Sequence, residues 1–475
     1  MKTIFKQPEP HLLGQTQHIH FVGIGGAGLS GIAEILAHHG FQITGSDQRQ
    51  NESTQRLIDL GLIIFQGHLA EQVGTADVVV TSPAVPTDNP EVQLAIARKI
   101  PVIRGAEMLA EIMRSYYSIA ISGTHGKTTT TAMTAAVLER LDPTVVVGGK
   151  LISIGSHARI GQSDLMVVEA DEAYGSFKHY TPGLAVVTSI DVDHLDYYHD
   201  LAEIRSAFLN FINKVPFYGS AVLCLDQENI RQILPQVRKR YVTYGVETEA
   251  EIKADQIQFE NTRSSFRVSQ SGNPLGQIQL NMPGLHNVSN ALAAIAVGLT
   301  ISSAFGRDYP TPLSFQQIQE ALANFQGIHR RFEILGEGKG IMVVDDYAHN
   351  PAKLRAVFRA AKTGYNRRVV GIVQPHRYQR VQSLADEFAV SFADTDLLLL
   401  TPIYAAEETP LNGVSAKILA DSIRDQGHPN VIYMSDLVVE EIVDLLQPND
   451  IVITAGAGDI WQVGRKLLKY LKDAN

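Results

Sequence analysis

Short apolar runs that end in glycine or polar residues recur along the whole of this 475-residue chain. "HIHFVGIGG", "SIAISGTHGK" and "IMVVDDYAHN" are examples, and each is followed by a stretch whose apolar residues recur at helical spacing. Strands that alternate with helices in this way pair in parallel and are covered by the helices on their faces. The chain is too long for one hydrophobic core, so we expect several such α/β domains.

The pattern falls into blocks, and the sequence predicts three domains, each built on a mostly parallel sheet. We expect a Rossmann-like domain over residues 1–114, a central domain with a phosphate loop over 115–325, and a second Rossmann-like domain over 326–475. A polar, alternating stretch from about 249 to 280 predicts a small antiparallel sheet on the side of the central domain. In open α/β sheets ligands bind beyond the carboxyl ends of the strands, where the polar residues of this chain gather.

Charge and hydropathy limit the partners of the chain. The net charge of −10, from 40 basic and 50 acidic side chains, argues against a general nucleic-acid binder, whose domain is expected to be basic. The N-terminal stretch has no apolar core of signal-peptide length, and no apolar run approaches the ~20 residues of a membrane helix. The lone cysteine, Cys224, lies in an apolar run typical of a buried strand and cannot form an intramolecular disulfide. We therefore expect a cytoplasmic protein without nucleic-acid or membrane partners, either a monomer or a dimer.

The first glycine loop, "HFVGIGGAGLSG" at residues 20–31, has the spacing G-x-G-x-x-G through Gly23, Gly25 and Gly28. It follows a predicted strand and precedes a predicted helix, so its backbone N–H groups and the helix N-terminus favour a pyrophosphate. Asp47 lies about 20 residues beyond the loop, where a nicotinamide enzyme places the acid that binds the ribose hydroxyls. Taken alone, this loop favours a dinucleotide and a nicotinamide-dependent oxidoreductase.

A second loop, "SGTHGKTTTT" at residues 122–131, has the character of a phosphate loop. Gly126, Lys127 and Thr128 match the end of the pattern G-x-x-x-x-G-K-[ST], but Ile121 occupies the position of the first glycine and Gly123 lies closer in. The shortened loop still places N–H groups before a helix, with a lysine for the β- and γ-phosphates and a threonine hydroxyl for Mg²⁺. The sequence therefore predicts an ATP site here.

Acidic residues follow two further predicted strands of the central block. "VVEADE" contains Glu169, Asp171 and Glu172, and "SIDVDHLDYY" contains Asp191, Asp193, His194 and Asp196. An acid at a strand end is by itself more often a helix cap. Carboxylates and an imidazole at neighbouring strand ends can hold Mg²⁺ beside phosphates, and next to a phosphate loop we favour that interpretation.

In the third block, charged and aromatic residues follow two strands. Asp345, Asp346, Tyr347 and His349 follow one, and His376, Arg377 and Arg380 follow the other. Two arginines three residues apart at the start of a helix are expected to face the same way, which suits a carboxylate or phosphate. A solvated helix face would carry the same pair, so both interpretations stay open.

Eight motifs together resemble the Mur ligases of peptidoglycan synthesis. They occur in family order between about residues 18 and 465: "GIGGAGLSGIAEIL", "SGTHGKTTTT", "VVEADE", "DVDHLDYY", "GLHNVSNALAA", "HRRFE", "VDDYAHNP" and "QPHRYQR". The forms "GGAG", "THGKTTTT" and "QPHRYQR" are similar to the branch of the family that adds L-alanine.

The resemblance implies an ATP-dependent carboxylate–amine ligase that joins L-alanine to the lactyl carboxylate of UDP-N-acetylmuramate. ATP would phosphorylate the carboxylate, the amine would attack the acyl phosphate, and ADP and phosphate would be released. A carboxylate anion is a poor electrophile, so phosphorylation provides the leaving group, while the protein positions the reactants and neutralises charge. The implied cofactors are ATP and Mg²⁺, and the implied partners are the two substrates.

The resemblance also assigns residues to sites. ATP is expected at Gly123, Thr124, His125, Gly126, Lys127, Thr128, Thr129, Asn287, Asn290, Arg331 and Asp346. The UDP-sugar is expected at Gly25, Gly26, Ala27, Gly28, Asp47, His68 and Ser82, and the amino acid at His349, His376, Arg377 and Arg380. Thr128, Glu169 and His194 are the expected metal ligands, and Lys127, His194, His376 and Arg377 the expected catalytic residues. With a sugar nucleotide in the first loop, Asp47 becomes at most a wall of the uridine site.

Other functions remain as alternatives. Asn350 stands where the alanine-adding branch commonly has a second histidine, which affects the local hydrogen bonding rather than the reaction class. The nearest alternative is a ligase that attaches a murein tripeptide to UDP-N-acetylmuramate. A nicotinamide-dependent oxidoreductase and a non-catalytic nucleotide switch are alternatives of other classes.

Overall fold

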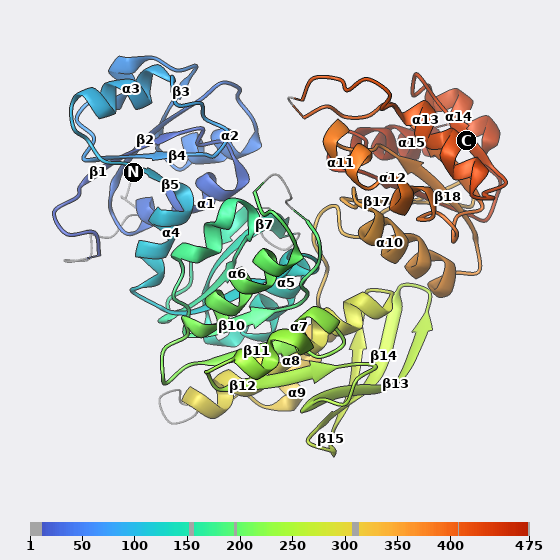
Figure 1. Ribbon diagram of the computed structural model, residues 1–475, viewed down its shortest axis with the longest axis horizontal. Coiled ribbons are helices and arrows are strands. Elements are labelled where there is room, and N and C mark those ends of the chain that lie inside the picture. The colour runs from blue at the N-terminus through green and yellow to red at the C-terminus, as the bar shows by residue number, and fades with distance from the viewer. Residues whose placement is uncertain (1–11, 152–155, 194–196, 306–312, 407, 474–475) are drawn as a thin grey trace. The chain divides into compact units, whose positions relative to one another are not determined.

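Three β-sheets organise the chain in its computed structural model, which describes residues 12–151, 156–193, 197–305, 313–406 and 408–473 (Figure 1). The predicted α/β class with mostly parallel sheets is confirmed. By internal contacts the chain forms two compact units. The first comprises the residues up to Ala254 with Val268–Gly276 and Ser289–Leu322, and the second comprises Asp255–Arg267, Gln277–Val288 and the residues from Ala323 onward.

The first sheet has parallel strands in the order β3-β2-β1-β4-β5. The strand order reverses between β1 and β4, which is where open α/β sheets bind ligands. The strands are β1 (His18–Val22), β2 (Gln42–Asp47), β3 (Ile63–Gln66), β4 (Val78–Thr81) and β5 (Val102–Arg104). The helices are α1 (Ala27–His38), α2 (Glu52–Asp59), η1 (Ala70–Val73), α3 (Pro90–Ala97) and α4 (Gly105–Met113).

Helix α1 begins directly after the first glycine loop and buries an apolar face that includes Leu29, Ile32 and Leu36. It ends at His38, and Gly40 then takes a φ of +88°. This left-handed conformation is one that glycine adopts without a Cβ clash, which is why glycine is common just beyond the end of a helix.

The second sheet has ten strands in the order β15-β14-β13-β12-β11-β10-β6-β9-β7-β8. Its strands are β6 (Tyr117–Ser122), β7 (Thr144–Leu151), β8 (Ser156–Arg159), β9 (Leu165–Glu169), β10 (Leu184–Val187), β11 (Ser220–Cys224), β12 (Tyr241–Gly245), β13 (Ile252–Glu260), β14 (Arg263–Gln270) and β15 (Asn273–Leu280). Its helices are α5 (Lys127–Val137), η2 (Glu139–Leu141), η3 (Ala173–His179), α6 (Leu201–Asn213), α7 (Glu228–Ile233), η4 (Leu234–Gln236), α8 (Leu285–Phe305) and α9 (Phe315–Ala323).

The polar strands expected to form a separate sheet instead continue the second sheet. β13 pairs in parallel with β12 through Tyr244–Ile252 and Gly245–Lys253. An open edge of β12 would leave backbone N–H and C=O groups unpaired, and β13 pairs with the end of that edge. Cys224 is buried at the end of β11 as predicted, and burial raises the pKa of its thiol.

Helix α8 corrects the expectation that no segment reaches membrane-spanning length. Within the described residues, Leu285–Ser303 is the one stretch long and apolar enough to cross a membrane, but 67% of its most apolar window is buried within the protein. A core helix that packs on every side has this composition.

The third sheet has the order β16-β17-β21-β18-β19-β20, with β16 antiparallel and the other strands parallel. The strands are β16 (Glu333–Gly338), β17 (Ile341–Asp346), β18 (Arg368–Val373), β19 (Leu397–Leu400), β20 (Val431–Tyr433) and β21 (Asp450–Ala455). The helices are α10 (Pro351–Gly364), α11 (Tyr378–Ser383), α12 (Ala385–Ala389), α13 (Ala416–Asp425), α14 (Val439–Leu445) and α15 (Trp461–Asp473).

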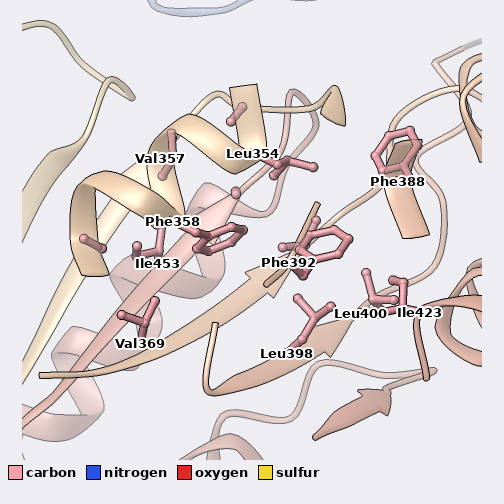
Figure 2. Close-up of a cluster of buried hydrophobic side chains, with 14 of the residues drawn as sticks. Leu354, Val357, Phe358, Val369, Phe388, Phe392, Leu398, Leu400, Ile423 and Ile453 are labelled. Carbon is pink, nitrogen blue, oxygen red and sulfur yellow. The ribbon is translucent and has the colours of Figure 1, made fainter. Parts of the chain in front are cut away.

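Both faces of the third sheet are buried. On one face Phe358 of α10 and Phe392 lie over the sheet among residues such as Leu398, their ring centroids 6.0 Å apart (Figure 2). A Cβ on Gly371 of β18 would lie 2.8 Å from the Phe358 ring, so glycine makes room for it. On the other face Leu467 of α15 packs into a second apolar cluster. Strands buried on both faces are continuous apolar runs, which is why they were recognisable in the sequence.

Candidate active site

The first glycine loop is held by residues at the end of β2. The amides of Gly23 and Ile24 donate to the carbonyl of Ser46 at 2.9 and 3.1 Å, and the Gly25 amide donates to Oδ2 of Asp47 at 2.9 Å. A Cβ on Gly25 would lie 2.9 Å from the same carboxylate oxygen, so the position requires glycine. One oxygen of Asp47 is thus engaged in shaping the loop.

The other residues predicted for the UDP-sugar lie around this loop. Gly26 is the N-cap of α1, Ala27 is its first residue, and a Cβ on Gly28 would meet nothing within 4 Å. The loop after β4 closes against the glycine loop, since a Cβ on Gly23 would lie 3.1 Å from that of Ser82. The structure therefore brings Asp47 and Ser82 to the loop and leaves open space beside Gly28.

His68, the remaining residue of that set, follows β3. Its Nδ1 lies 2.8 Å from Oε2 of Glu91 and 3.0 Å from Oγ of Ser46. Glu91, in the first turn of α3, is fully buried. Glu91 carries no sequence signal of a binding role, because "DNPEV" is typical of a helix start, and the Asn89 side chain accepts from the Glu91 amide at 2.9 Å.

The phosphate-type loop runs from the end of β6 to Lys127, the first residue of α5. Gly123 has a φ of +141°, and a Cβ there would lie 2.1 Å from Oγ1 of Thr188. Gly126 has a φ of +81°, and its Cβ would lie 2.5 Å from Oδ1 of Asn290. Ile121 is buried within β6, which explains why the first glycine of the usual pattern is displaced to 123.

The segment after β10 fixes this loop from one side. The amides of Thr124 and His125 donate to the carbonyl and the hydroxyl of Ser189 at 3.0 and 2.8 Å. The hydroxyl of Thr188 donates to the His125 carbonyl at 2.5 Å. The backbone of the loop is therefore set before any ligand binds, which is the requirement for a phosphate cradle.

Lys127 forms ion pairs with the acids that follow β9. Its Nζ lies 2.6 Å from Oε2 of Glu172 and 3.4 Å from Oδ1 of Asp171. Burial lowers the pKa of Lys127, but the nearby carboxylates, Glu172 above all, raise it beyond its ordinary value. The lysine is therefore a fixed cation at the mouth of the loop.

The predicted metal ligands are only partly within the described residues. Oγ1 of Thr128 donates to Oε1 of Glu169 at 2.8 Å, and Oε2 of Glu169 accepts from the Gly148 amide at 2.7 Å. His194 lies outside the described residues, and among those described no three His, Cys, Asp or Glu side chains are grouped to hold a metal. A hydroxyl and a carboxylate are the oxygen donors that Mg²⁺ prefers, so this pair fits the implied ion.

The two asparagines of "HNVSN" have different surroundings. Asn290 accepts from Oγ1 of Thr130 at 3.2 Å and lies against Gly126, so it belongs to the phosphate loop. Asn287 is buried and donates to the Pro283 carbonyl at 2.7 Å, which ties it to the start of α8. Thr129 is buried within α5.

The two aspartates at the end of β17 have different hydrogen-bond partners. Oδ1 of Asp345 accepts from Oγ1 of Thr454 at 2.6 Å, and Oδ2 lies 3.4 Å from Nε of Arg330. Burial raises the pKa of Asp345 to about 6, against the Thr454 hydrogen bond and the Arg330 charge. Asp346 accepts from the amides of Phe332 and Ala348, each at 2.7 Å, and so braces the turn around it.

Arginines and aromatic rings surround this strand end. The guanidinium carbons of Arg330 and Arg331 lie 4.8 and 5.3 Å from the centre of the Tyr347 ring. The ring of His376 stacks on Tyr404, with centroids 5.5 Å apart and planes at 8°. Tyr404 was not predicted, because its segment shows no pattern that distinguishes it from a loop.

The two histidines of the third sheet hold opposite tautomers. Nδ1 of His349 lies 2.8 Å from the Tyr347 carbonyl, which only accepts, so Nδ1 carries a proton and Nε2 has the lone pair. Nδ1 of His376 lies 3.2 Å from Nη1 of Arg380, which only donates, so Nε2 carries the proton. Burial and neighbouring cations hold both pKa values below the usual range, that of His376 at about 4, so both rings are neutral at pH 7.

The expectation that Arg377 and Arg380 face the same way from the start of one helix is wrong. Helix α11 begins at Tyr378, and Arg377 precedes it with a φ of +67°. Helical spacing does not apply to Arg377 and Arg380, because only the second lies on the helix. Asn350, the departure from the family pattern, is the N-cap of α10 and accepts from the Lys353 amide at 3.0 Å.

Three family models cover the chain in order. The Mur ligase family catalytic domain matches residues 18–117, the Mur ligase middle domain 121–298, and the Mur ligase glutamate ligase domain 330–458. Together they match more than half of the sequence.

Full-length relatives support the same assignment. The UDP-N-acetylmuramate–L-alanine ligase of Syntrophotalea carbinolica is 52% identical over 97% of this chain and 99% of its own, and that of Geotalea uraniireducens is 50% identical over the same shares. The solved UDP-N-acetylmuramate–alanine ligase of Thermotoga maritima matches 97% of this chain and 100% of its own, with a TM-score of 0.79 and 30% identity. The chain therefore belongs to the Mur ligase family, whose members are ATP-dependent ligases.

Proposed function

We propose that this chain ligates L-alanine to the lactyl carboxylate of UDP-N-acetylmuramate, with conversion of ATP to ADP and phosphate, in peptidoglycan precursor synthesis. The observation that carries the proposal is the identity of 52% to a UDP-N-acetylmuramate–L-alanine ligase along nearly the whole of both chains. The phosphate loop and the neutral histidine pair supply the chemistry that such a ligation needs.

Each sheet is proposed to serve one ligand. The domain of residues 1–114 binds the UDP-sugar at Gly25, Gly26, Ala27, Gly28, Asp47, His68 and Ser82. The domain of residues 115–325 binds ATP, and that of 326–475 binds the amino acid and contributes Arg331 and Asp346 to the nucleotide. Asn287 and Asn290 are proposed to lie near the adenine.

Phosphorylation of the lactyl carboxylate is assigned to the phosphate loop. The amides of residues 126–128 and the Nζ of Lys127 bind the phosphates, while the amides of Thr124 and His125 stay bonded to Ser189. The phosphates compete with Glu172 and Asp171 for the lysine. Thr128 and Glu169 would hold Mg²⁺, with His194 proposed for a second ion, and the bound metal would shield phosphate charge. The lysine stays protonated throughout, because carboxylates or phosphates always surround it.

Attack by the amine is assigned to the third domain. Nε2 of His349 offers a lone pair to an ammonium or amine N–H, whereas Nε2–H of His376 donates to an oxygen. Arg377 is proposed to bind the alanine carboxylate, and Arg380 acts through His376 by fixing its tautomer. The amine would attack the acyl carbon, and the tetrahedral intermediate would expel phosphate to leave the amide.

A phosphate-release assay tests the proposal. With UDP-N-acetylmuramate and ATP–Mg²⁺ we expect release that requires L-alanine, with glycine, L-serine and the tripeptide L-alanyl-γ-D-glutamyl-meso-diaminopimelate as comparators. Release with the tripeptide but not with alanine would replace the proposal with the tripeptide-adding alternative. A change in nicotinamide absorbance, or ATP binding without turnover, would favour the alternatives of other classes.

A further inference from the structure

A chain of polar side chains crosses the interior of the first sheet. It lies on the face of β1 that also carries Val22, which packs with Val73 of η1 and Ala95 of α3. Strands of a parallel sheet are expected to be apolar on both faces, so buried polar residues here require an explanation. The members are His18 and His20 of β1, Thr44 and Ser46 of β2, His68 after β3 and Glu91 of α3.

The hydrogen bonds converge on Glu91. Oε1 lies 3.1 Å from Nε2 of His20, and Oε2 lies 2.7 Å from Oγ of Ser46 and 2.8 Å from Nδ1 of His68. The Glu91 side chain has 0% exposure. A carboxylate in the interior is tolerated because it receives several donors and lies in the first turn of a helix.

The proton positions along this chain are determined by the carboxylate. Glu91 accepts only, so Nε2 of His20 and Nδ1 of His68 both donate. Nδ1 of His20 then accepts from the Thr44 hydroxyl, and that hydroxyl accepts from Nε2 of His18, each at 2.8 Å. In each of these hydrogen bonds the donor therefore faces the residue that lies nearer to Glu91 along the chain of side chains.

His68 is the member that reaches the surface beside the glycine loop. Its side chain is 13% exposed, whereas those of His20 and Glu91 have no exposure. With Nδ1–H turned inward, Nε2 has a lone pair, and this atom has no hydrogen-bond partner in the described part of the chain. Ser46 connects the network to the glycine loop, because its carbonyl also accepts from the amide of Gly23.

We propose that Glu91 is a positioning residue for UDP-sugar binding. It holds His68 as the Nδ1–H tautomer, so that Nε2 accepts a hydrogen bond from an N–H or O–H of the uridine moiety. A diphosphate has only acceptors and is served by the amides of the glycine loop, whereas the uracil N3–H and the ribose hydroxyls are donors. The inference rests on the proposed function of the first domain and names a residue outside the family motifs quoted above.

The decisive variant is Glu91→Gln. A glutamine in this place presents its amide N–H either to Nε2 of His20, at the position of Oε1, or to Nδ1 of His68, at the position of Oε2. In the second orientation His68 has to turn Nδ1 into an acceptor and carry its proton on Nε2. We expect UDP-N-acetylmuramate to bind about 10- to 100-fold more weakly by calorimetry, as for the loss of one buried hydrogen bond. KM for ATP and for L-alanine should stay unchanged. Glu71→Gln, an equal charge change on the exposed surface of η1, is the matched control and should bind as wild type.

Two further measurements separate positioning from a general loss of structure. Histidine ¹⁵N shifts should report the Nδ1–H tautomer of His68 in the wild type and the Nε2–H tautomer in Glu91→Gln. Two analogues of UDP show which donor is used: N3-methyl-UDP lacks the uracil N3–H, and 2′,3′-dideoxy-UDP lacks the ribose hydroxyls. One of them should bind to the wild type more weakly than UDP does. This difference in affinity should disappear in Glu91→Gln. If Glu91→Gln does not fold, His68→Asn, which keeps an inward donor but lacks the outer acceptor, should show the same loss of affinity.

The outcomes are distinguishable. A wild-type chain that does not bind UDP-N-acetylmuramate overturns the proposed function itself. A wild type that binds it, together with an unaltered affinity in a Glu91→Gln chain whose ¹⁵N shifts report the Nε2–H tautomer of His68, overturns the positioning role alone. An unaltered affinity in His68→Asn overturns it as well. Equal binding of UDP and both modified nucleotides to the wild type overturns the donor assignment.

Discussion

Nζ of Lys127 lies 2.6 Å from Oε2 of Glu172, a carboxylate whose side chain is only 3% exposed. Lys127 is thus held, without a nucleotide, by the carboxylate of Glu172, which follows the end of β9. Attraction to this carboxylate orients the ammonium, and a triphosphate bound at the proposed ATP site would compete for it. The pair therefore contributes both to the stability of the loop and to its function.

Replacement of Lys127 should separate these contributions. We expect Lys127→Met to reduce ligation by about 10³-fold or more, with UDP-sugar affinity unchanged, because the phosphates lose their cation. It should also lower the free energy of unfolding by about 3–5 kcal/mol, because the buried Glu172 carboxylate loses its ion pair with Nζ of Lys127. The double variant Lys127→Met/Glu172→Gln should recover stability in denaturant titrations without recovering turnover. Normal turnover in Lys127→Met would show that the loop assignment is wrong.

Removal of the Glu169 carboxylate should weaken metal binding. Glu169→Gln keeps the acceptor for the Gly148 amide but loses the charge, so the Mg²⁺ concentration for half-maximal activity should rise by about 10- to 100-fold. Titration of activity with Mg²⁺ measures this, with Glu139→Gln on the protein surface as the control. An unchanged Mg²⁺ dependence would remove Glu169 from the metal site.

Arg377 should act on alanine rather than on ATP. We expect Arg377→Ala to raise KM for L-alanine about 10- to 100-fold, since a charge-assisted hydrogen bond to its carboxylate is lost, while KM for ATP stays the same. Initial rates at varied alanine and ATP concentrations test this. Arg359→Ala, on the exposed side of α10, is the matched control, and an unchanged alanine KM in Arg377→Ala would contradict the role.

Asp345 should make stability depend on pH. Burial raises its pKa to about 6 in the folded chain from 3.8, so the folded state binds the proton more tightly. The stability that this group contributes is fully present below pH 3.8 and is lost as the pH rises through about 6. Asp345→Asn cannot ionise and keeps an acceptor for Thr454. The free energy of unfolding of this variant minus that of the wild type should therefore increase by up to about 3 kcal/mol from pH 4 to pH 7.

Denaturant unfolding at several pH values measures this difference. Effects of the replacement on packing and hydrogen bonding that do not depend on pH shift the two curves by a constant offset, so the test is the change of the difference with pH rather than its value at one pH. A difference that stays constant from pH 4 to 7 would contradict the raised pKa.

Much of the fold could be predicted because the strands of the first and third sheets are short apolar runs with polar ends, and periodicity reports this directly. The glycine turn before α5 was also predictable, since Lys127 and Thr128 are adjacent in sequence and the turn needs glycine at 126. The orientation of Arg377 was not, because one residue with a positive φ before α11 breaks the helical spacing. The extent of the second sheet was missed for a similar reason: strand polarity does not report which edge β13 joins.

The sequence by itself determined the α/β class, the two glycine loops and the family, because these depend on residues that are neighbours along the chain. Only the tertiary structure decided which charges meet. Glu91 lies 71 residues from His20 and 23 from His68, and Lys127 lies 45 from Glu172. Such pairs leave no periodic trace in the sequence, because a hydrogen bond depends on a few ångströms of three-dimensional separation and on burial, and both arise only when the sheets are assembled.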